Sequence, residues 1–138
     1  MKYYANIKDL EPHIISELLQ MCFNYCNNIN IYFPHDCSSD IKSFKDAFVS
    51  LTSIGEIDQE DTDLGQLDEK EGFSMLIATL SRDIETLLLN KPPNINISYG
   101  LLDETHLFLY LDEEGEIIIE SDKLLPNIHP VLMHLKEV

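Results

Sequence analysis

The densest group of potential ligands in this sequence is an acidic run at residues 56–71, EIDQEDTDLGQLDEKE. It holds eight carboxylates and one lysine, a net charge of −7 in a chain whose formal charge is −16. Because Ca²⁺ prefers carboxylate oxygens, the run must be compared with the 12-residue EF-hand loop. Counted from Glu60, Gly65 and Glu71 match the sixth and twelfth positions, but Leu64 at the fifth has no ligand oxygen. We therefore expect no specific calcium site.

A second metal chemistry is suggested by thiols and imidazole, which are ligands for zinc. Cys22 and Cys26 lie four residues apart, and His35 and Cys37 follow them. However, Cys22 and Cys26 fall on the apolar stripe of a predicted helix, where free cysteine behaves as a small hydrophobic residue. We expect both thiols to be reduced, buried and metal-free, and the protein to have no cofactor. A zinc site made of these four residues is the alternative.

Catalytic signatures are absent from the sequence. It contains no G-x-S-x-G elbow, no glycine-rich phosphate loop and no H-E-x-x-H motif. Its five histidines form no recognised constellation, and His13 and Glu17 have the i, i+4 spacing of a surface pair on a helix. We expect a protein that is not an enzyme, with an enzyme of unrecognised site as the alternative.

The charge balance limits the classes of partner. With 25 acidic residues against 9 basic ones, the chain would repel a nucleic-acid backbone or an anionic membrane surface. Basic proteins are the natural partners of such a surface. The first residues do not read as a signal peptide, and no 18-residue apolar run is present. The odd number of cysteines, three, favours reduced thiols, so we expect a cytoplasmic protein.

The elements that must position these residues are predicted from apolar spacing. Residues 9–26, 38–53 and 73–90 show helical spacing, and a short C-terminal helix is predicted from Asn127. Residues 94–99, 105–111 and 116–120 are strand-like, and the last two flank a hairpin turn at Asp112–Gly115. Residues 27–36 are turn-like and then briefly strand-like.

This order of elements predicts an α+β fold in a single domain, 1–138. Three N-terminal helices would pack on a small antiparallel sheet, with a hairpin near residues 105–120 and a short C-terminal helix. A chain of 138 residues with 44% hydrophobic residues can bury a substantial core in one domain.

The predicted functional surface is anionic. Apolar residues stand among the acids of residues 56–71, as at protein interfaces, and a second acidic group occupies the hairpin tip. The alternative is that the run is only a solvated loop. The predicted partner-binding residues are Glu56, Ile57, Asp58, Glu60, Asp61, Asp63, Leu64, Leu67, Asp68, Glu69, Asp112, Glu113, Glu114 and Glu116.

In size, acidity and order of elements, and in its lack of a catalytic motif, the chain resembles the small acidic immunity proteins of bacterial toxin–immunity systems, such as those of contact-dependent growth inhibition. The resemblance is one of type over the full length, with no family motif to transfer. It implies tight, neutralising binding to a basic toxin domain, often a nuclease. An adaptor or regulatory subunit that binds another basic protein is the alternative binding role.

Overall fold

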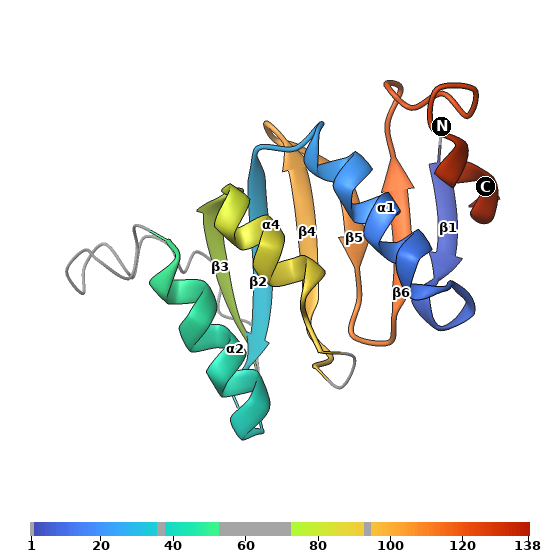
Figure 1. The fold of residues 1–138 in the computed structure, drawn as a ribbon. Helices are drawn as coiled ribbons and strands as arrows, with labels where there is room; N and C mark the ends of the chain where they lie inside the picture. The colour runs from blue at the N-terminus through green and yellow to red at the C-terminus, as the bar shows by residue number, and fades with distance from the viewer. Residues whose placement is uncertain (1, 36–37, 53–72, 93–94) are drawn as a thin grey trace.

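The computed structural model describes residues 2–35, 38–52, 73–92 and 95–138 (Figure 1). Within these residues, one antiparallel sheet has the strand order β3-β2-β4-β5-β6-β1-β7. The strands are β1 Lys2–Asn6, β2 Asn28–Pro34, β3 Phe73–Thr79, β4 Ser98–Asp103, β5 His106–Leu111, β6 Glu116–Glu120 and β7 Lys136–Glu137. The helices are α1 Pro12–Phe23, α2 Ser39–Ser50 and α4 Arg82–Leu89, with 3-10 turns η1 Ile7–Asp9 and η3 Pro130–His134.

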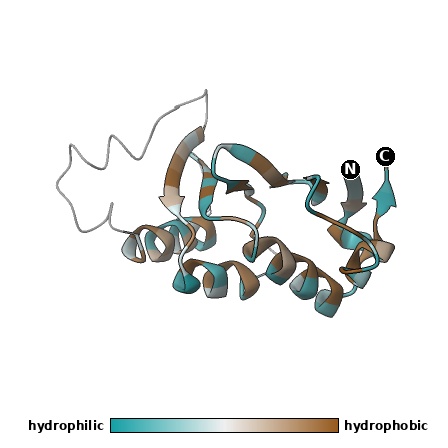
Figure 2. Ribbon diagram, turned by 90° about the horizontal axis from the view of Figure 1, so that it is seen from above, coloured by the Kyte–Doolittle hydropathy of each residue, from teal (hydrophilic) through white to brown (hydrophobic). Residues whose placement is uncertain are grey.

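The three α-helices lie on one face of the sheet (Figure 2). The core is the layer between them, because each strand turns alternate side chains toward the helices. Leu18, Phe48 and Ile84, one from each helix, are almost fully buried in this layer. Ile31, Leu101 and Ile119 meet them from the sheet. None of the helices in the described residues is long and apolar enough to cross a membrane.

The first two predicted helices are confirmed, with shorter bounds. Pro12 occupies the first turn of α1, where its missing N–H costs no hydrogen bond. Ser38 caps α2, since its side chain accepts a hydrogen bond from the Ile41 N–H at 3.3 Å.

The predicted third helix at residues 73–90 is wrong. Its first half is strand β3, in which Ser74 and Leu76 are buried toward the helices, and β3 pairs with β2 in the register Ile31 to Leu76. Only its second half is helical, as α4, capped by the Ser81 side chain. The apolar residues satisfied a helical spacing over a short run, but pairing with the neighbouring strand decided the outcome.

The predicted arrangement of three N-terminal helices on a small sheet is also wrong. Strands dominate the structure, and the helices alternate with them along the chain. The N-terminal residues form β1, which pairs with β6 in the register Tyr4 to Ile118. The predicted strand at 94–99 is displaced to Ser98–Asp103, and the predicted C-terminal helix is the 3-10 turn η3.

The predicted hairpin is confirmed. β5 and β6 pair in the register Leu109 to Ile119 and Leu111 to Ile117, which places all four side chains in the core. The turn between them is the predicted Asp112–Gly115, with Gly115 at a φ of 91°. A residue with a side chain is strained at this φ, so glycine is required by the backbone.

Candidate functional site

Hydrogen bonds to the Asp112 side chain and to the segment η1 hold the hairpin tip. The Asp112 carboxylate accepts hydrogen bonds from the N–H groups of Glu114 and Glu116, both at 2.9 Å. The Gly115 carbonyl accepts from the Ile7 N–H at 2.8 Å, and this bond joins the tip to η1. A Cβ at Gly115 would come within 2.9 Å of Ile7 Cγ1, so the two segments are in close contact.

The four acids predicted here therefore have different environments. Asp112 is engaged in the turn, and Glu116 accepts a hydrogen bond from the Tyr4 hydroxyl at 3.1 Å. This bond is the main cause of the raised pKa of Tyr4. Glu113 and Glu114 are exposed, and no hydrogen bond or ion pair joins their carboxylates to any described residue. Among the described residues of the predicted surface, these two carboxylates are available to a partner.

The other predicted partner-binding residues lie outside the residues that the structure describes. They are Glu56, Ile57, Asp58, Glu60, Asp61, Asp63, Leu64, Leu67, Asp68 and Glu69. The loop compared with an EF-hand also falls there.

An apolar opening lies beside the hairpin tip, and its cavity has a volume of about 290 Å³. Leu10 and Ile97 line it together with the tip residues Asp112, Glu113 and Glu114. Two lysines, Lys8 and Lys91, also line the opening, so its polar residues carry both signs of charge. Apolar anchors inside a polar rim are the arrangement that protein interfaces use.

A second cavity of about 250 Å³ adjoins the first between α1 and the C-terminal end of α4, and Lys91 lines both. Lys91 donates a hydrogen bond from Nζ to the Ile95 carbonyl at 2.7 Å, and burial lowers the pKa of this lysine. Tyr99 is buried at the same cavity, and burial raises the pKa of its hydroxyl. Sequence reasoning missed both residues, because they line the same cavity only through the way that α4 and β4 pack.

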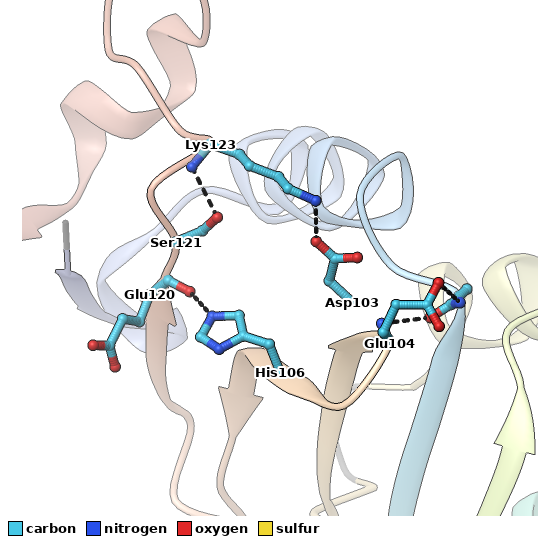
Figure 3. Close-up of polar contacts among 7 residues, drawn as sticks. Asp103, Glu104, His106, Glu120, Ser121 and Lys123 are labelled. Atoms are coloured by element: carbon cyan, nitrogen blue, oxygen red, sulfur yellow. Dashed lines mark hydrogen bonds and ion pairs between the residues drawn. The ribbon is translucent and has the colours of Figure 1, made fainter.

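The opposite end of the sheet, at the β4–β5 turn, carries a polar cluster (Figure 3). Lys123 forms an ion pair with Asp103, and His106 Nε2 hydrogen-bonds the Glu120 carbonyl at 2.8 Å. Glu104 has a φ of 56° and is held by Asn27, whose Oδ1 accepts from the Glu104 N–H at 2.9 Å. Since these groups bond to one another, the cluster fastens the turn and the chain after β6.

The candidate zinc residues divide between two parts of the fold. Cys22 is buried on α1, and Cys26 is half-buried rather than buried as predicted. His35 follows the far end of β2 and shares a hydrogen bond with Ser74 Oγ at 2.8 Å, and Cys37 lies outside the described residues. Among the described residues, no group of three or more His, Cys, Asp or Glu side chains is arranged to hold a metal ion.

Comparison with known proteins adds no relative to this geometry: no family model, curated protein or solved structure matches the chain. The resemblance to immunity proteins is therefore untested and stays a prediction.

Proposed function

We propose that this protein is an acidic, cytosolic protein-binding module that neutralises a basic partner, in the way that immunity proteins neutralise toxin domains. The observation that carries the proposal is the exposed pair Glu113 and Glu114 on a turn that Asp112 holds by two hydrogen bonds. The pair stands beside an apolar opening, so a basic segment with an apolar side chain could make both kinds of contact at once.

Electrostatics supports a binder of this kind. A net charge of −16 attracts a basic partner, and screening limits this attraction to a distance of about 8 Å at physiological salt. Complementary charge can raise association rates to about 10⁸–10⁹ M⁻¹s⁻¹ at low salt. Rapid capture suits a protein that must neutralise a toxin, and a turn whose backbone is already held by hydrogen bonds loses little backbone entropy on binding.

The test starts with the partner recovered from the native cell, whose association and dissociation rates are then measured with purified protein. The variant Glu113→Lys with Glu114→Lys changes the charge by the same amount as a control, Glu17→Lys with Asp46→Lys, on exposed positions of α1 and α2. We expect the tip variant to slow association at least tenfold at low salt, and the control to slow it much less.

The acidic run is tested in the same assay. Reversing Asp58, Glu60, Asp61 and Asp63 to lysine should slow association sharply, whereas Leu67→Ala should mainly speed dissociation if that side chain fills a partner pocket. If the variant with all four charges reversed binds with full strength and independently of salt, the acidic run is not part of the interface.

Neutralisation separates this proposal from its alternatives. An immunity protein abolishes the partner's toxicity or enzymatic activity in a cell that expresses both, whereas an adaptor or regulatory subunit binds the partner without abolishing it. If the tip variant and the control bind alike and salt has no effect, the proposed surface is wrong. A measured turnover of substrate by the protein itself would favour the enzyme alternative.

A further inference from the structure

The cavity between α1 and α4 has an apolar lining. Ile15 and Leu19 line it from α1, Leu88 from α4, and Leu111 and Ile117 from the sheet. Its volume of about 250 Å³ exceeds that of an engineered cavity of about 150 Å³ that admits benzene. Binding sites for small molecules have this character, in which a few polar groups are set into an apolar wall.

Lys91 is the one charged residue among those that line this cavity. In a chain with 25 acidic and 9 basic residues, composition alone would favour an acid at such a position. The Lys91 ammonium has three N–H donors, and a single bond to the Ile95 carbonyl accounts for one of them within the described structure. The lysine is half-buried, so a carboxylate at this point would meet a cation that water solvates only in part.

Tyr99 supplies a second polar group. Its side chain is 1% exposed and lines the cavity, and its hydroxyl hydrogen-bonds to none of the described residues. The hydroxyl is a hydrogen-bond donor on a residue that lines the cavity, and it is not among the fully buried atoms that lack a partner. A ligand with a hydrogen-bond acceptor would satisfy this hydroxyl.

We infer that the α1–α4 cavity binds a small amphipathic carboxylate, with its apolar body against Leu19 and Leu88 and its acidic group toward Lys91. The Tyr99 hydroxyl supplies a further donor within the same cavity. The hairpin-tip acids line the cavity beside the tip, and none of them lines the α1–α4 cavity. This inference does not depend on the proposed function.

Octanoate and 1-octanol are a matched pair of probes, because they share an apolar body and differ in charge. Each is titrated at pH 7 into the folded protein while backbone amide shifts are followed by NMR. We expect octanoate to shift residues around the cavity and to bind more tightly than octanol. Lys91→Met should weaken octanoate about tenfold or more and leave octanol within twofold, since a charged hydrogen bond is lost. Tyr99→Phe should weaken octanoate by a smaller factor.

Two controls separate the site from nonspecific effects. Lys8→Met removes a lysine that lines only the adjoining cavity and should not change octanoate binding. Ser16→Leu fills the cavity from α1 and should abolish binding of both probes, whereas Gln20→Leu on the exposed side of α1 should not.

Equal affinity for the two probes, or no loss with Lys91→Met, would overturn the carboxylate assignment. An absence of shifts around the cavity at millimolar octanoate would overturn the site. If octanoate fails to bind while Ser16→Leu weakens the basic protein partner, the cavity accepts a side chain of that partner and the inference is wrong.

Discussion

The two ends of the central hairpins use their charged residues in different ways. At the β4–β5 end, Asp103 pairs with Lys123, and Glu104 bonds to Asn27 (Figure 3). At the β5–β6 end, Asp112 fixes the turn and leaves Glu113 and Glu114 exposed to solvent. Side-chain hydrogen bonds hold both turns, but only the β5–β6 turn presents carboxylates without a partner among the described residues. Charge alone therefore does not mark a binding surface, because the local bonding decides which carboxylates are available.

The largest expected effect concerns the core near the β4–β5 end. Leu80 is 8% exposed at the junction of β3 and α4, and its N–H bonds to the Asn27 carbonyl at 2.9 Å. Leu80→Ala should lower the free energy of unfolding by about 2–5 kcal/mol. Ile7→Ala, under the tip but only half-buried, should cost less. Urea denaturation of both variants checks the order, and a loss below about 0.5 kcal/mol for Leu80→Ala would contradict its place in the core.

A smaller effect is expected on the free energy of unfolding when glycines are replaced, and it should differ between two positions. Gly115→Ala should cost about 1–3 kcal/mol, because it combines a positive φ with a contact of 2.9 Å to Ile7 Cγ1. Gly100→Ala should cost less, since the added Cβ would meet the movable ends of the Asn30 and Leu107 side chains. Thermal unfolding of both variants tests the comparison, and an equal or reversed order would mean that the tip is less constrained than described.

The side chains that fix the two turns should make similar, modest contributions to the stability of the protein. Asp112→Ala removes two hydrogen bonds to backbone N–H groups, and Asn27→Ala removes the bond to the Glu104 N–H. Each should cost about 1 kcal/mol, as for other side chains that cap backbone donors. Glu113→Ala should leave stability unchanged within error. A large loss for Glu113→Ala would show that its carboxylate is engaged rather than available.

The smallest expected effect is on thiol reactivity at the β4–β5 end. Burial, followed by the charge of Asp103, raises the pKa of Cys26 to about 12, and Lys123 opposes this shift. The thiolate fraction at pH 9 is therefore low, and iodoacetamide should modify Cys26 much more slowly in the folded protein than in urea. Because the unfolded thiol ionises first, this residue's contribution to stability is complete below about pH 9 and is lost as pH rises toward 12.

Substitution near the thiol distinguishes the two ends. Asp103→Asn should speed the modification of Cys26 modestly, because it removes a negative charge that disfavours the thiolate. Glu113→Gln at the other end should not change the rate. Peptide mass spectrometry after timed alkylation separates Cys26 from Cys22, and equal effects of the two substitutions would contradict a local cause.

The candidate site was predictable only in part. The hairpin-tip acids were predicted from a turn signature, since Asp and Gly at a turn between two apolar strands define a local structure. The tertiary structure was needed to show that Asp112 is hydrogen-bonded whereas Glu113 is exposed. The cavity at Lys91 and Tyr99 has no local signal, because it forms where two helices and the sheet fail to fill the space between them.

The sequence by itself determined α1, α2, the β5–β6 hairpin and the acidic character of the surface. In those elements, caps, turn residues and apolar spacing act within a few residues of one another. Only the tertiary structure decided that residues 73–79 are a strand and that Lys2–Asn6 joins the sheet. A strand is stabilised by its neighbours in the sheet. Because β1 pairs with β6, more than a hundred residues away in the sequence, no local pattern specifies that pairing.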